Sequence, residues 1–178
     1  MSVDTPFTAE EVADLRKLLE IEKIRKVKTL YSQLMDARDW RGLSMIFAED
    51  VVAELGAYGD LAGRAAVTAA ISGEAPDDGE TLPSLMRGRA PYDGLHLTTN
   101  MWIELTGPDT AVARTYLHDV MFEAHPRINP LLMFGIYDED YVKRDGNWQI
   151  ARFRVQFLWP ERAVADDFPR KMVPTPLA

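Results

Sequence analysis

The sequence contains no cysteine, which excludes disulfide bonds and thiolate metal ligands. It also lacks an apolar run long enough to cross a membrane, since its longest stretches, such as residues 130–134, span only a few residues. The first residues do not show the basic-then-apolar pattern of a secretory signal. These absences favour a cytoplasmic protein that does not act at a membrane.

Positive charge is scarce as well, because 20 Lys and Arg stand against 28 Asp and Glu, which leaves a formal net charge of -8. A phosphate backbone is repelled by such an excess unless a strong basic patch overrides it. Arg25, Lys26 and Lys28 lie close together, but we interpret them as the solvated face of a helix. Nucleic acid is therefore not an expected partner.

A length of 178 residues suits one domain with one substantial core. The sequence shows neither an internal repeat nor a low-complexity tract. We expect a single domain over residues 1–178, with a core over about 10–160 and an extended C-terminal arm over 161–178.

The N-terminal part of the sequence is typical of helices. Thr8 and Glu11 form a capping-box pattern, and apolar residues then recur at roughly helical spacing up to Leu34. Asp39 is well placed to cap a second, short helix. The apolar residues that support the first helix are Val12, Leu15, Leu19, Ile24, Val27, Leu30, Tyr31 and Leu34.

The rest of the chain is predicted to consist mainly of strands, with one short helix and one long loop. A strand is predicted over 51–55, a short alanine-rich helix over 64–71, and a long loop over 72–93 that is either a lid or a disordered segment. Four further strands are separated by clear turn sequences. These strands are predicted over 95–105, 111–124, 131–143 and 148–159.

Helices followed by an antiparallel meander indicate an α+β fold. We expect a cone-shaped, curved antiparallel sheet wrapped around the N-terminal helices. The wide end of such a cone is a natural ligand pocket.

The three histidines are the first candidates for chemistry: His96, His118 and His125. Strand alternation places His96, Thr98 and Asn100 on one face, which is polar enough to face either water or a pocket. If His96 faces inward, the outer face would carry Leu97, Met101 and Ile103. An exposed apolar sheet face of this kind predicts a homo-oligomer.

Other polar residues are harder to place from spacing alone. His118 and Asp119 must point to opposite faces of their strand, and periodicity does not choose between them. Asp36 ends the first helix without an evident structural duty, because Asp39 takes the capping role; a carboxylate of this kind can orient a histidine. Tyr31 is either a core aromatic or a pocket residue, and Arg152 and Arg154 share a face that either supplies charge to a pocket mouth or pairs with surface carboxylates.

Motifs for metals and cofactors are missing. The sequence has no HxxxH, HxH or HExxH spacing, no P-loop, no G-x-G-x-x-G fingerprint and no G-x-S-x-G elbow. If the protein is an enzyme, we expect side-chain acid–base chemistry without a metal or a cofactor.

Several segments resemble SnoaL-like proteins of the nuclear transport factor 2-like superfamily over roughly residues 10–160. They are residues 21–24, 30–40, 96–100 and 137–148. Within the superfamily the sequence is most similar to cofactor-independent lyases, which include scytalone dehydratase, bile acid 7α-dehydratase and γ-hexachlorocyclohexane dehydrochlorinase.

The resemblance implies that Asp36 orients His96, which removes the proton in an elimination. Tyr31 and Asp119 match a pocket tyrosine and a strand carboxylate of the bile acid enzyme, which favours Asp119 over His118 as the inward residue. Met35 replaces a tyrosine of scytalone dehydratase, and His118 is offset from that enzyme's second histidine. We expect Thr98, Asn100, His118, Met35 and Arg154 to contact a substrate.

The function implied is a dehydratase-like lyase acting on a mostly apolar, small and in some cases cyclic molecule. An isomerase or a cyclase would use the same dyad, and the fold also hosts non-catalytic binding or assembly modules. The related lyases are commonly trimers, so a trimer is favoured over a dimer.

Overall fold

The computed structural model describes residues 6–56, 59–72, 92–123, 131–160 and 162–168. Most of the predicted loop, the end of the predicted C-terminal arm and His125 lie outside these residues. No helix in the described part of the chain is long and apolar enough to cross a membrane. The elements are α1 (Ala9–Asp36), α2 (Trp40–Ile46), β1 (Phe47–Glu54), β2 (Asp60–Ala62), α3 (Arg64–Ser72), β3 (Tyr92–Leu105), β4 (Thr110–Glu123), β5 (Leu131–Arg144) and β6 (Asn147–Trp159).

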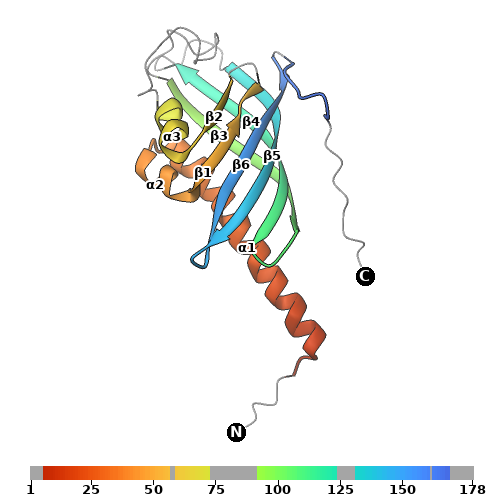
Figure 1. The fold of residues 1–178 in the computed structure, drawn as a ribbon. Coiled ribbons are helices and arrows are strands. Elements are labelled where there is room, and N and C mark those ends of the chain that lie inside the picture. The colour runs from red at the N-terminus through yellow and green to blue at the C-terminus, as the bar shows by residue number, and fades with distance from the viewer. Residues whose placement is uncertain (1–5, 57–58, 73–91, 124–130, 161, 169–178) are drawn as a thin grey trace.

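The strands form one curved, six-stranded sheet in the order β2-β1-β6-β5-β4-β3. The predicted antiparallel meander is confirmed as β3 to β6. β1 joins it by pairing parallel to β6, which makes the whole sheet mixed. Figure 1 shows α1 lying against one face of this sheet, with α2 and α3 beside β1 and β2. We call the face that α1 covers the inner face and the opposite one the outer face.

Two predicted caps set where the helices begin. Thr8 and Glu11 form the capping box of α1, and the Asp39 side chain accepts a hydrogen bond from the Gly42 backbone N–H at 2.8 Å to cap α2. Ile24, Lys28 and Tyr31, spaced by four and three residues, are the buried face of α1. Lys28 is only 2% exposed, so its predicted place on a solvated face is wrong.

A β-bulge in β3 changes which residues face the core. Thr99 pairs with Tyr116 and Trp102 with Arg114, so two residues of β3 lie opposite one residue of β4. Asn100, the first of the two, has a positive φ of 52°.

The bulge reverses the alternation of side chains after residue 100. Ile103 is therefore buried in the core and Met101 packs against it, which corrects their predicted place on the outer face. Leu97 is exposed as predicted. The large apolar side chains exposed on the outer face of β3 to β6 are Leu95, Leu97, Trp102, Tyr116, Phe134 and Trp159.

Candidate active site

Asp36 and His96 meet where the end of α1 reaches β3. The Nδ1 atom of His96 lies 2.7 Å from Oδ1 of Asp36, and the backbone N–H of His96 donates to the same oxygen at 3.0 Å. The side chain of His96 is 13% exposed and that of Asp36 is 25% exposed, so the contact is largely but not completely shielded from solvent. With the Asp36 carboxylate as acceptor, Nδ1 carries the proton and Nε2 is left with a free lone pair.

Local structure explains how Asp36 comes to this place. It is the last residue of α1, and the chain turns sharply after it because Arg38 has a positive φ of 55°. Asp39 caps α2, which leaves the Asp36 carboxylate free to reach β3. Asp36 nevertheless has a structural duty that spacing did not indicate, since it ties the strand backbone to the end of the helix.

Asp119 approaches the other side of the imidazole from β4. His96 and Asp119 are direct cross-strand partners, and Oδ2 of Asp119 lies 3.7 Å from Nε2 of His96. The Asp119 side chain is buried, and its Oδ1 has no hydrogen-bond partner among the described residues. Burial raises the pKa of the Asp119 carboxyl, an effect that the nearby His96 opposes.

Tyr31 forms the wall beneath His96. Their rings meet edge to face with centroids 6.5 Å apart, and the Tyr31 hydroxyl lies 3.5 Å from that of Tyr137. Burial raises the pKa of Tyr31 above its usual range, so its hydroxyl stays protonated.

Two further predicted residues lie close to the pair. The Thr98 hydroxyl is 3.1 Å from that of Ser32, which places Thr98 on the inner face beside α1. Met35, next to Asp36 in α1, is partly buried and packs against the core.

The comparisons with known proteins agree with this architecture. The model of the SnoaL-like domain matches residues 16–154. The chain belongs to the SnoaL-like family. No curated protein sequence matches it significantly.

Solved structures similar to this SnoaL-like chain share its fold. A scytalone dehydratase-like protein from Novosphingobium aromaticivorans has a TM-score of 0.67 at 20% identity, over 83% of this chain and 93% of that one. A protein of the nuclear transport factor 2-like type with a cystatin-like fold, from the same species, has a TM-score of 0.67 at 22% identity, over 90% and 94%. The hexachlorocyclohexane dehydrochlorinase LinA-type3 from Novosphingobium barchaimii has a TM-score of 0.63 at 17% identity, over 85% and 99%.

Three residues predicted to contact a substrate in this SnoaL-like chain do not join the dyad. Asn100 is exposed on the bulge rather than aligned with His96. His118 is exposed on the outer face, where its ring contacts that of Phe134 at 5.4 Å between centroids. Arg154 pairs across the sheet with Asp138, which is also on the outer face.

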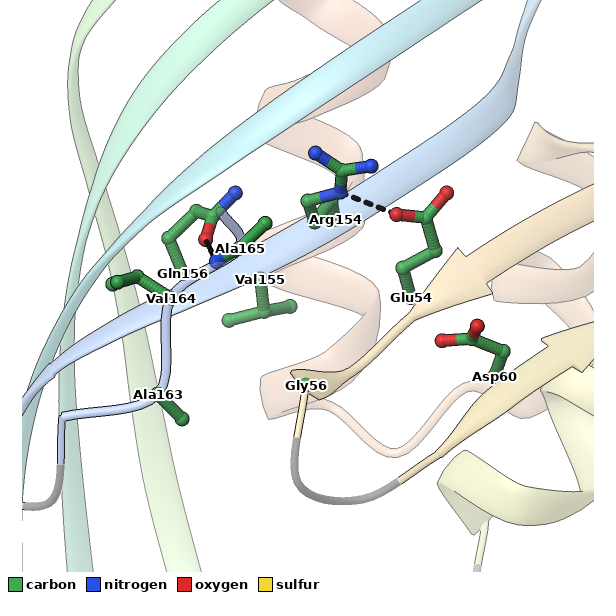
Figure 2. A pocket seen from close by; sticks show the side chains of 9 residues that line it. All are labelled: Glu54, Gly56, Asp60, Arg154, Val155, Gln156, Ala163, Val164 and Ala165. Atoms are coloured by element: carbon green, nitrogen blue, oxygen red, sulfur yellow. Dashed lines mark hydrogen bonds and ion pairs between the residues drawn. The ribbon is translucent and has the colours of Figure 1, made fainter. Parts of the chain in front are cut away.

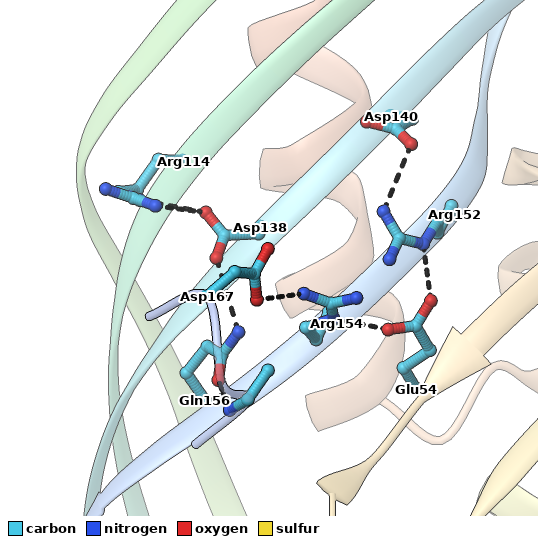
Figure 3. Close-up of polar contacts among 9 residues, drawn as sticks. Glu54, Arg114, Asp138, Asp140, Arg152, Arg154, Gln156 and Asp167 are labelled. Atoms are coloured by element: carbon cyan, nitrogen blue, oxygen red, sulfur yellow. Dashed lines mark hydrogen bonds and ion pairs between the residues drawn. The ribbon is translucent and has the colours of Figure 1, made fainter. Parts of the chain in front are cut away.

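Arg154 belongs instead to a network of ion pairs, as Figure 3 shows. Its guanidinium binds Glu54 and also Asp167, and Arg152 binds the same Glu54. Arg154 also lines a pocket of about 260 Å³ between β1, β2, β6 and residues 163–165, which does not include the dyad (Figure 2). Arg152 and Arg154 thus pair with carboxylates on the outer face.

A buried ion pair beneath the tyrosines was missed from the sequence. The Lys28 Nζ lies 2.7 Å from Oε1 of Glu139 and 3.5 Å from the centre of the Tyr137 ring. The signal was available, because Lys28 comes four residues after Ile24 and three before Tyr31, on the line of the core-facing residues. The described residues contain no group of three or more histidine, aspartate or glutamate side chains that could hold a metal.

Proposed function

We propose that this protein is a cofactor-independent lyase of the dehydratase type, in which His96 removes a proton from a carbon atom of the substrate. The observation that carries the proposal is that the His96 imidazole lies between two carboxyl groups. Asp36 is 2.7 Å from Nδ1, and Asp119 is 3.7 Å from Nε2. General acid–base catalysis requires such a base with a fixed tautomer and a free lone pair.

Asp36 sets the direction in which His96 acts. Because its carboxylate accepts the Nδ1 proton, the basic lone pair is on Nε2, which points toward Asp119. When Nε2 takes a proton, the Asp36 carboxylate stabilises the charge of the imidazolium, and Asp119 does the same once it has given up its own proton. A proton-transfer step at carbon is thereby favoured.

Asp119 is suited to be the acid that completes the elimination. Burial raises its pKa, which makes its protonated form more accessible than that of an exposed aspartate, and this form would donate a proton to a departing hydroxyl group. The substrate C–H bond breaks and its electron pair forms the C=C bond, while the C–O bond breaks and the oxygen leaves as water with the proton of Asp119. Transfer of the proton from Nε2 of His96 to Oδ2 of Asp119 then restores both groups.

The surroundings of the dyad favour an apolar substrate. Leu117 and Met133, which pair with Thr98 and Asp119 in the sheet, are buried on the same inner face. The Tyr31 ring adds an aromatic wall with a protonated hydroxyl. The few polar groups near His96 would orient a substrate from the class of small, largely hydrophobic molecules, a class that includes cyclic compounds.

A screen of steroid-like and aromatic hydroxy compounds tests the proposal, with loss of water followed by mass spectrometry. We expect His96→Ala to lower kcat by about 10²–10⁴-fold and Asp36→Asn to lower it in the same direction, with ligand affinity retained in both. His118→Ala is the matched control, since this histidine lies on the outer face, and it should keep full activity.

Three results of the screen would contradict the proposal. Compounds that bind without conversion indicate a binding module. A product of unchanged mass indicates an isomerase or a cyclase. Equal turnover of His96→Ala and His118→Ala removes His96 from the mechanism.

We also propose that the protein forms a homo-oligomer through the outer face, with a trimer favoured by the resemblance to the related lyases. The support is the contiguous row of Leu97, His118, Phe134 and Trp159, which pair in register across four strands, with the three apolar members exposed. Exposed apolar surfaces of this kind mark association sites.

A further inference from the structure

Two tyrosine hydroxyls meet in the core beneath the dyad. The hydroxyl oxygens of Tyr31, on α1, and Tyr137, on β5, lie 3.5 Å apart, and both residues are only 4% exposed. Neither hydroxyl has another hydrogen-bond partner in the described part of the chain. Because hydroxyls buried in this way are normally hydrogen-bonded, we expect one of the two to donate to the other.

The hydrogen atoms of the pair are not all used by this contact. The two hydroxyls carry two hydrogens, and only one of them can lie between the oxygens. The hydroxyl that accepts the bond keeps its own hydrogen, which has no acceptor among the described residues. A buried donor left in this state is costly unless a bound ligand or water accepts from it. The pair therefore offers one hydrogen-bond donor to a bound molecule.

Lys28 favours Tyr137 as the donor of the bond between the tyrosines. The Lys28 Nζ atom lies 3.5 Å from the centre of the Tyr137 ring and 4.4 Å from that of the Tyr31 ring. Burial lowers the pKa of Lys28, but Glu139, at 2.7 Å, opposes this effect and favours the charged form. A cation beside a phenol makes its O–H group more acidic and a stronger donor, and this effect is greater for the nearer ring, Tyr137.

The pKa shifts of the two tyrosines have the signs expected for this direction. Burial raises the pKa of both. The hydrogen bond between them opposes the rise in the pKa of Tyr31 and adds to the rise in the pKa of Tyr137. An accepted hydrogen bond stabilises a phenolate, whereas a donated one stabilises the neutral phenol, so Tyr31 accepts and Tyr137 donates.

Tyr31 is also the member of the pair that contacts the dyad. Its ring meets that of His96 edge to face, with centroids 6.5 Å apart. Tyr137 pairs with Thr115, which lies four residues along β4 from Asp119, or about 13 Å in an extended strand. The unused hydrogen of Tyr31 is therefore the one that a substrate bound at His96 can reach.

We infer that Tyr137 donates its hydrogen bond to Tyr31 and that Tyr31 donates its own to an oxygen atom of the substrate. This oxygen is the one that gains negative charge when His96 removes a proton from the neighbouring carbon. Tyr137 does not touch the substrate; it is a positioning residue that holds the Tyr31 hydroxyl in the orientation that reaches the pocket. The inference rests on the proposed function, because the charge on the substrate oxygen arises only if His96 is the base.

Carbon NMR tests the bond between the tyrosines without a substrate. In protein labelled with 13C at Cζ of tyrosine, Tyr137→Phe should shift the Tyr31 signal, which is assigned by its loss in Tyr31→Phe. The ring of residue 137 stays in this variant, and only its O–H group is lost. Tyr116→Phe, on the outer face, is the matched control and should leave the Tyr31 signal in place.

A Tyr31 signal that does not move in Tyr137→Phe would overturn the inference. If Tyr137→Phe does not fold, the same contact is measured from the other side, through the shift of the Tyr137 signal in Tyr31→Phe. A Tyr137 signal that stays in place in that variant has the same consequence.

Turnover of a compound converted in the screen tests what the pair does. We expect Tyr31→Phe to lower kcat by about 10²–10³-fold, the usual effect of removing one donor to a developing negative charge. Tyr137→Phe should lower kcat by about 2–10-fold and keep the ligand affinity, because it weakens this donor without removing it. Tyr31→Phe/Tyr137→Phe should be no slower than Tyr31→Phe alone, because Tyr137 acts through Tyr31.

The pattern of losses separates this inference from its alternatives. A greater loss of kcat in Tyr137→Phe than in Tyr31→Phe would reverse the direction of the bond, and losses that multiply in the double variant would indicate a merely structural role; either result overturns the inference. Full activity of Tyr137→Phe beside an inactive His96→Ala also overturns it and leaves the proposed function intact. Turnover that His96→Ala does not change contradicts the proposed function itself, together with the inference that rests on it.

Discussion

The buried pair of Lys28 and Glu139 offers a quantitative test of the core beneath the dyad. The side chains are 2% and 0% exposed, and the Lys28 ammonium also lies over the rings of Tyr31 and Tyr137. Lys28→Met keeps most of the side-chain volume but leaves the Glu139 carboxylate without its cation. Removal of one partner of a buried ion pair costs about 3–5 kcal/mol. For a chain of this size, where 1 kcal/mol shifts Tm by about 2–4 °C, the expected loss is about 6–20 °C.

A double-mutant cycle separates this effect from simple loss of packing. Lys28→Met/Glu139→Gln removes both charges, so it should be more stable than Lys28→Met alone. Urea unfolding followed by tryptophan fluorescence gives the free energies of unfolding for the four proteins. A single variant that loses less than about 1 kcal/mol, or a double variant no more stable than the single one, would refute the reasoning.

Three further outcomes follow from the geometry. Because burial raises the pKa of Asp119, ionisation of this group destabilises the fold as pH rises through that pKa. In urea unfolding at neutral pH, Asp119→Asn should therefore be more stable than wild type, by no more than the ~1–3 kcal/mol cost of a buried unpaired polar group. This gain in stability should vanish in acid. Arg154→Ala should keep the turnover of wild type, since the ion pairs of Arg154 lie on the outer face, away from the dyad; a loss of kcat would contradict this placement. Leu97→Glu should lower the oligomer mass in analytical ultracentrifugation, and an unchanged mass would exclude the outer face as an interface.

Local signals in the sequence were enough to predict most of the fold. The capping residues Thr8 and Asp39 and the turn at Asp145-Gly146 give the boundaries of helices and of a hairpin directly. The parallel pairing of β1 with β6 was not predictable in this way, because it joins strands far apart in the chain.

The candidate site was predictable in part. His96 and Asp36 stood out because their polar side chains lacked an obvious local partner, and the structure brings them together. Asn100 was misplaced because strict alternation fails at a bulge; asparagine tolerates the positive φ that it has there, but this residue type alone does not predict an extra residue. Lys28 was misplaced because its charge was given more weight than its helical position. Local patterns also could not reveal Glu139, the partner that permits its burial, because Glu139 is distant in the chain.

The protonation state of the His96 ring tests the central claim most directly. In 15N NMR spectra of the imidazole nitrogens, with signals assigned by His118→Ala and His96→Ala, we predict that the neutral form of His96 carries its proton on Nδ1 and leaves Nε2 unprotonated. Asp36→Asn should remove this preference. A neutral His96 with its proton on Nε2 in the wild-type protein would contradict the assignment of His96 as the base.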